Sequence, residues 1–195
     1  MDMPDSQINL ILASASPRRI ELLSRFSLPF MTVPSNYKEE IPDMPYEEAV
    51  VYLARCKAEE VASRYEGLIL AADTAVIIDG MILGKPKDRS SAKDMIMKLS
   101  GCCHQVLTGV VLLDTATQRS SQAVDVTSVW FRRLDEAEIE RYLDHAEYTD
   151  KAGAYAAQGI AAAFITRIEG CYHNVIGLPL HLVDSMLHAY GISLF

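Results

Sequence analysis

The sequence has few cysteines, no basic run and no long apolar run, and each absence excludes a class of protein. The four cysteines include the adjacent pair Cys102 and Cys103 but no CxxC spacing, so neither a zinc site nor a disulfide framework is indicated. The longest apolar runs are too short to span a bilayer. The first residues carry Asp2 and Asp5 and do not resemble a signal peptide. We therefore expect reduced thiols, a cytoplasmic location and no membrane partner.

The balance of charge argues against one further class. The net charge is −8 and no basic cluster interrupts it, whereas proteins that bind nucleic acid through general electrostatics are basic. Half of the 195 residues are hydrophobic, enough for a full core. No repeat or linker divides the chain, so residues 1–195 are expected to form a single domain, which could have two lobes. The alternation of strands and helices predicts an α/β fold with a mixed sheet.

Residues 10–23 read as a buried strand that stops at two hydroxyls and continues as a helix. Ser16 is a good N-cap residue, and Pro17 suits the first helical position, where its missing N–H costs nothing. Arg18 and Arg19 then lie in the first turn, where cations oppose the helix dipole unless an anion is also present. The segment therefore indicates either a phosphate site or an ordinary capped helix with solvated arginines.

Two further charged residues stand next to apolar segments. The period of residues 46–63 predicts a helix, and Lys57 lies at the edge of its apolar stripe. Its ammonium either reaches out to solvent or points into a cavity that holds an anion. Asp73 ends the apolar run of residues 67–72, so we expect it at a break in a central strand, where α/β sheets place ligands. A cap or turn role is the alternative.

The other expected elements follow from hydrophobic periodicity and from turn residues. The Asp79-Gly80 pair predicts a tight hairpin turn after a strand at 76–78. Expected strands lie at residues 8–13, 29–34, 104–114, 122–132 and 163–166, and expected helices at residues 90–99, 134–146 and 178–189.

Several motifs together resemble the Maf family of nucleoside triphosphate pyrophosphatases. The resemblance runs from about residue 9 to residue 190, and it depends on the order and spacing of the motifs. They are Ser14-Ala15-Ser16-Pro17-Arg18-Arg19, Lys57-Ala58, Ala72-Asp73-Thr74, Gly84-Lys85-Pro86, Leu99-Ser100-Gly101 followed by His104, Val106, Thr108 and Gly109, Asp150-Lys151-Ala152-Gly153-Ala154-Tyr155 with Gln158-Gly159, and Gly177-Leu178-Pro179-Leu180.

The resemblance implies a fold and a reaction. The fold is a long, curved mixed sheet flanked by helices, with two lobes around a nucleotide cleft, similar to inosine triphosphate pyrophosphatases. The reaction is hydrolysis of a nucleoside triphosphate between its α and β phosphates, with Asp73 as the proton acceptor. The family also includes proteins linked to septum formation, so a nucleotide-binding regulator of cell division with little or no hydrolysis is the alternative function. A homodimer is expected from the same resemblance.

The resemblance also implies roles for individual residues. Asp73 and an acidic residue of the Lys38-Glu39-Glu40 segment would form a metal site. Glu39 fits the family's position best, and Glu40 stays open because the loop varies in length. The ion would be Mg²⁺ or Mn²⁺, since no His/Cys cluster indicates zinc. Phosphate-binding groups are expected from a wider set, namely Ser14, Ser16, Arg19, Lys57 and Lys85. We expect His104 to form a structural hydrogen bond, although an acid or base role is open.

Three residues are expected to determine which nucleotide base the protein recognises. Arg18, Thr74 and Gln158 match the branch of the family that acts on dTTP and UTP. An amide such as Gln158 can both donate to and accept from a pyrimidine edge. Cys171 departs from the family, whose members often carry Ser or Asp at that position.

Overall fold

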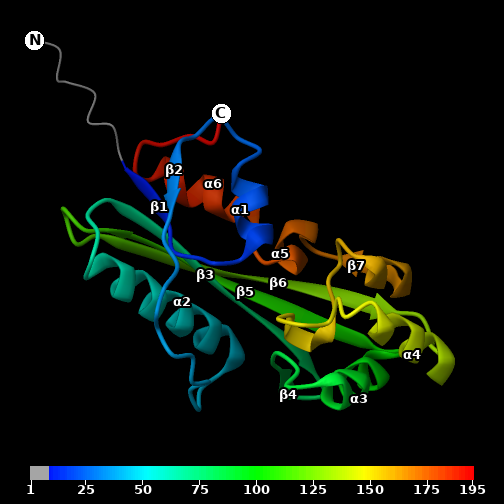
Figure 1. The fold of residues 1–195 in the computed structure, drawn as a ribbon. Helices are drawn as coiled ribbons and strands as arrows, with labels where there is room; N and C mark the ends of the chain where they lie inside the picture. Colours follow the sequence, from blue (N-terminus) through cyan, green and yellow to red (C-terminus); the bar gives the residue numbers. More distant parts are fainter. Residues whose placement is uncertain (1–8) are drawn as a thin grey trace, which may run out of the picture. The chain divides into compact units, whose positions relative to one another are not determined.

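The structure is a computed structural model that describes residues 9–195, and its centre is a mixed β-sheet of seven strands (Figure 1). The order is β2-β1-β3-β5-β6-β7, and β4 pairs with β3. β1 is parallel to β2 and β3, whereas β4 runs antiparallel to β3 and β7 antiparallel to β6. This confirms the expected α/β fold. The strands are β1 (Leu10–Leu12), β2 (Phe30–Thr32), β3 (Leu68–Ile78), β4 (Met81–Leu83), β5 (Cys103–Asp114), β6 (Ser120–Phe131) and β7 (Ile165–Glu169).

Six α-helices and two short 3₁₀ helices accompany the sheet within residues 9–195. They are α1 (Pro17–Leu23), α2 (Tyr46–Ala62), α3 (Arg89–Leu99), α4 (Glu136–Asp144), α5 (Tyr172–Ile176), α6 (Leu180–His188), η1 (Ala152–Ala154) and η2 (Ile160–Phe164). The sequence did not predict α5, because a helix of five residues is too short to show a period. None of the helices described here has the length and apolar character needed to cross a membrane.

The described residues divide into two compact units. Unit 1 comprises residues up to Asp73, Gly109–Val124 and Leu180–Phe195, and unit 2 comprises Thr74–Thr108 and Asp125–Pro179. The long strands β3, β5 and β6 contribute residues to both units. The single domain expected from the sequence stays a prediction.

In unit 1, helix α2 packs on one face of the strands, and α1 and α6 lie on the other (Figure 1). Ala54 and Ala58 of α2 are buried against Ile69 and Ala71 of β3. The small alanine side chains allow α2 to pack close to β3. A side chain at Gly109 would place its Cβ 2.5 Å from the carbonyl of Val50, so only glycine fits where β5 passes under α2.

Unit 2 has its own core, in which α3 and α4 lie side by side (Figure 1). Asp88 and Asp135 begin these two helices with capping boxes, in which each carboxylate accepts from the backbone N–H three residues later. The core is rich in aromatic rings, and Phe131 makes edge-on contacts with His104, Tyr155 and Phe164. Much of the unit's side-chain packing is thus centred on β5 and β6.

Strand β3 corrects one expectation and the hairpin after it confirms another. Asp73 does not lie at a break, because β3 continues through it to Ile78. The run of apolar residues ends at Asp73. The strand continues beyond it because the polar side chains in the middle of β3 have hydrogen-bond partners in the protein. Asp79 and Gly80 have φ of 48° and 69°, as the tight turn between two antiparallel strands requires.

Candidate functional site

A lysine held between two carboxylates is the central feature of the site residues in unit 1. The Lys57 Nζ of α2 lies 2.5 Å from Asp73 Oδ1 and 2.6 Å from Glu39 Oε1. The Lys57 and Asp73 side chains are each only 11% exposed, whereas Glu39 is 43% exposed. Lys57 therefore points inward and does not reach out to solvent. One largely buried ammonium brings together α2, β3 and the loop after β2.

Arg19 adds a second cation to the same group. Its Nη1 lies 3.5 Å from Ser14 Oγ. Burial lowers the pKa of Arg19 from its ordinary value, and Arg18 lowers it further, while Asp73 and Glu39 act in the opposite direction. These interactions require Arg19 to lie within electrostatic reach of both carboxylates. A guanidinium stays charged even after such a shift, so it can serve as an anion-binding group.

Ser14 and Ser16 differ in what their side chains do. The buried Ser14 Oγ accepts from the Ser16 N–H at 3.1 Å. Ser16 is the N-cap residue of α1, as predicted, but its own side chain makes no capping hydrogen bond. The capping role expected for that hydroxyl is therefore wrong. The hydroxyl that fixes the turn belongs to Ser14, and it links this turn to Arg19.

The structure distinguishes the two acidic residues that the sequence left open. Glu39 contacts Lys57, and its neighbour Glu40 is exposed with no such contact among the described residues. The Glu39 and Asp73 oxygens both reach the same ammonium, so the two carboxylates can converge on one cation. Hard oxygen donors of this kind suit Mg²⁺ or Mn²⁺. The residues present thus fit the divalent metal that the sequence analysis expects.

Three of the predicted site residues belong to unit 2. Thr74 is half-buried and follows Asp73 on β3, Lys85 is exposed just after β4, and Gln158 is exposed just before η2. The Gly84 carbonyl accepts from Gly153 N–H at 3.1 Å, which ties the segment before Lys85 to η1. Asp73 and Thr74 are therefore consecutive residues of one strand that belong to different units.

His104 occupies the aromatic core of unit 2. It is 2% exposed, and its Nε2 lies 2.8 Å from Tyr155 Oη. Burial lowers the pKa of His104 to about 4. The ring is therefore neutral at physiological pH, and it makes the structural hydrogen bond that we expected.

Sequence reasoning missed a group of buried polar residues behind Thr74. Thr108, Thr127 and Asn174 are each 0% exposed. Thr74 Oγ1 lies 3.0 Å from Thr108 Oγ1, and Thr108 in turn donates to the Asn174 carbonyl at 3.2 Å. Asn174 Nδ2 donates to Val106 O and to Thr127 Oγ1, both at 2.9 Å. Thr108 belongs to one of the matched motifs, but the motif does not show that its hydroxyl meets Thr74 and Asn174, which come from separate segments.

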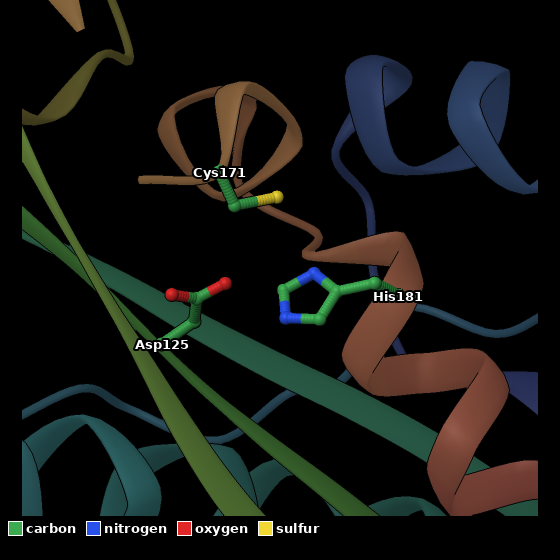
Figure 2. Close-up of side chains that lie close together, drawn as sticks. All are labelled: Asp125, Cys171 and His181. Atoms are coloured by element: carbon green, nitrogen blue, oxygen red, sulfur yellow. The ribbon is translucent and has the colours of Figure 1, made fainter. Parts of the chain in front are cut away.

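Thr127, a member of the same group, also makes hydrogen bonds to the backbone of Cys171. The Cys171 N–H donates to Thr127 Oγ1 at 3.0 Å, and Thr127 Oγ1 donates to the Cys171 carbonyl at 3.2 Å. In Figure 2 the Cys171 thiol lies near the Asp125 carboxyl of β6, within 4.8 Å. The figure also draws His181, which belongs to unit 1. Within unit 2, Cys171 is thus fixed through its backbone at the start of α5.

Comparisons with known proteins agree with the motifs. Residues 9–190 match the family described as Maf-like protein. A protein of Carboxydothermus hydrogenoformans named dTTP/UTP pyrophosphatase is 45% identical and covers 94% of this chain and 100% of its own. Proteins of the same name from Thermococcus gammatolerans and Symbiobacterium thermophilum are 47% and 46% identical, covering 89% and 95% of this chain and 92% and 96% of their own.

One solved structure is also similar, a HAM1 protein from Coxiella burnetii. It is 13% identical, with a TM-score of 0.47 over 65% of this chain and 74% of the other.

Proposed function

Because the chain belongs to the Maf-like protein family, we propose that it is a nucleoside triphosphate pyrophosphatase that hydrolyses dTTP and UTP. Its products would be the nucleoside monophosphate and pyrophosphate. Relatives that match nearly the whole chain carry the name dTTP/UTP pyrophosphatase. The observation in the structure that carries the proposal is the Lys57 ammonium held by Asp73 and Glu39 beside Arg19. Such a mixture of cations and carboxylates suits the binding and hydrolysis of a phosphate anhydride.

In this proposal Asp73 accepts the proton of the attacking water. The water oxygen bonds to the α phosphorus, the bond from that phosphorus to the bridging oxygen breaks, and pyrophosphate leaves with the bonding electron pair. A carboxylate close to the attacking water can take the proton that the water loses. The position of Asp73 in the middle of a paired strand holds this carboxylate firmly. Lys57, 2.5 Å away, fixes the orientation of its Oδ1.

The cations of the site serve the phosphates. A triphosphate carries about four negative charges at neutral pH, and phosphoryl-transfer enzymes act mainly by positioning and neutralising that charge. Arg19 and Lys57 supply two cations in unit 1, and Ser14 and Ser16 supply hydroxyls in the same unit. Lys85 is proposed as a further phosphate-binding cation.

A divalent metal is proposed as the cofactor. Asp73 and Glu39 would hold it, because both carboxylates reach a common cation. When bound, Mg²⁺ or Mn²⁺ neutralises phosphate charge and lowers the pKa of a bound water. The metal would compete with Lys57 for these carboxylates. The Lys57 ammonium would then be available to a phosphate oxygen.

The choice of dTTP and UTP is proposed to depend on Arg18, Thr74 and Gln158. Gln158 and Thr74 carry neutral polar groups that can pair with a pyrimidine edge. Arg18 precedes Arg19 in α1, close enough to influence its pKa. A homodimer, a cytoplasmic location and the absence of a nucleic-acid partner complete the proposal, the last supported by the net charge of −8. Light scattering on the purified protein measures the oligomeric state.

The test of the proposed function is pyrophosphate release from a panel of nucleoside triphosphates with Mg²⁺ or Mn²⁺. We expect turnover of dTTP and UTP by the unmodified protein. Asp73→Asn should lower kcat by at least ~100-fold, a typical contribution of a positioned base, and should still bind nucleotide. Asp79→Asn is the matched control, because Asp79 is an exposed turn residue next to the same strand and Asn tolerates its positive φ.

The outcomes separate the possibilities. Full turnover by Asp73→Asn would remove Asp73 as the proton acceptor. If the unmodified protein binds triphosphates but releases no pyrophosphate from any of them, the enzyme assignment fails, and a nucleotide-binding regulator takes its place.

A further inference from the structure

The turn that carries Gln158 is closed by its own backbone. The Gly159 N–H donates to the Ala156 carbonyl at 3.1 Å, which makes a β-turn with Ala157 and Gln158 at its two central positions. Ala157 is buried in the core of unit 2, whereas Gln158 is exposed. The turn therefore presents one polar side chain, that of Gln158, outward from a buried base.

A carboxylate from another segment of unit 2 holds the far side of this turn. Glu147, in the loop after α4, accepts from the Ile160 N–H through its Oε2 at 2.7 Å. The same carboxylate covers Gly159, since a Cβ on that glycine would overlap it. A hydrogen bond from a backbone N–H to a carboxylate is stronger than one to a neutral acceptor. Glu147 thus fixes the two residues that follow Gln158.

The segment is also fixed before Gln158. The buried Tyr142 of α4 donates from its Oη to the Ala154 carbonyl at 2.9 Å. Glu147 lies close to this hydroxyl, because burial raises the pKa of Tyr142 and Glu147 raises it further. One side chain in α4 and one just after it therefore make hydrogen bonds to the backbone on both sides of Gln158.

We propose that Glu147 is a positioning residue for recognition of the pyrimidine base. It holds the backbone of Gly159 and Ile160 so that the Gln158 amide meets the base in one orientation. An amide pairs well with a base edge only when it is held to within about 0.5 Å of the right place. A support that is rigid before the substrate arrives also lowers the entropy lost on binding. The inference rests on the proposed function, in which Gln158 contacts the base.

Paired substitutions test whether Glu147 acts through Gln158. Glu147→Ala removes the acceptor of the Ile160 N–H and should lower kcat/KM for UTP, measured by pyrophosphate release, by about tenfold, the size of one lost hydrogen bond to a charged group. The loss should appear in KM, because Gln158 binds the base and not the reacting phosphorus. In the Gln158→Ala background the same change should cost about twofold or less, as for a residue that acts only through its partner. Glu147→Gln, which keeps a side-chain acceptor, should restore most of the activity.

The matched control is Asp135→Ala. Asp135 is another carboxylate of unit 2 that accepts from a backbone N–H, that of Glu138 at 2.8 Å, but it lies at the opposite end of α4 from Glu147. Its loss should change kcat/KM by the same factor with and without Gln158. A merely structural role for Glu147 predicts that behaviour too, so equal factors for Glu147→Ala in the two backgrounds would overturn the inference.

Gly159→Ala covers the case in which Glu147→Ala does not fold. The added methyl group would overlap the Glu147 carboxylate, which is the end of a flexible side chain, and should displace it from the Ile160 N–H. We expect the same rise in KM for UTP, and an unchanged KM would contradict the inference.

Two outcomes separate this inference from the proposed function. If Gln158→Ala leaves the kinetics on UTP unchanged, the inference fails while the pyrophosphatase stands. Failure of the unmodified protein to hydrolyse both dTTP and UTP would instead overturn the proposed function.

Discussion

The neutral, buried state of His104 predicts a specific loss of stability in mild acid. Burial lowers the pKa of His104 to about 4 in the folded protein, whereas an unfolded histidine titrates near 6.5. Between these values the unfolded chain binds more protons than the folded one. The stabilisation is therefore complete above about pH 6.5 and is lost as the pH falls toward 4.

The size of the loss follows from the two pKa values. Proton linkage gives a decrease in the free energy of unfolding of about 1 kcal/mol at pH 6, about 2 kcal/mol at pH 5 and about 3 kcal/mol at pH 4, relative to pH 8. Carboxylates titrate in the same range, so the histidine must be isolated by difference. His104→Gln has no proton to gain, and its amide can still pair with the Tyr155 hydroxyl.

The assay is urea unfolding of both proteins at several pH values between 4 and 8, followed by circular dichroism. The free energy of unfolding of the unmodified protein minus that of His104→Gln should fall by about 3 kcal/mol from pH 8 to pH 4. His188→Gln, at a surface histidine that is 58% exposed, should follow the unmodified protein. Parallel curves for the unmodified protein and His104→Gln would refute the reasoning.

Two further predictions concern unit 1. Gly109→Ala places a Cβ 2.5 Å from the Val50 carbonyl and should lower the free energy of unfolding by about 2 kcal/mol, seen as a lower Tm; Gly84→Ala, which meets nothing within 4 Å, should not. Lys57→Met leaves the buried Asp73 carboxylate without its ammonium and should lower the free energy of unfolding by about 3 kcal/mol. Combined with Asp73→Asn, it should cost at least ~1 kcal/mol less than the two single losses together, and strictly additive losses would contradict the direct coupling.

Hydrophobic periodicity predicted most of the helices and strands. Two correct predictions, a helix and a turn, have simple physical causes. Helix α2 buries one stripe of small and apolar side chains, which repeats with the helical period. The Asp79-Gly80 turn needs two residues that tolerate positive φ, and that pair is recognisable in any sequence. The break expected at Asp73 was wrong because the sequence does not show that Lys57 and Thr108 satisfy the polar groups of β3.

The site residues were predicted unequally. Resemblance to a family indicated Lys57, Asp73 and Arg19, and the structure brings these three together in unit 1. The choice between Glu39 and Glu40 depends on which loop carboxylate reaches Lys57, and an irregular loop has no period from which to read it. The hydrogen bonds of Thr108 and Asn174 were missed for a related reason, since a buried threonine in a strand looks like any other β-branched residue until its hydrogen-bond partners are known.

Because β3 runs without a break through Asp73, the number of residues before Asp73 in the strand determines the face of the sheet on which its side chain lies. Ile69, Ala71 and Asp73 alternate with their neighbours, and all three face α2. Inserting or deleting a single residue between Leu68 and Asp73 would turn the carboxylate to the opposite side of the sheet, away from Lys57. Changes of length are therefore tolerable only in the loops on either side of the strand.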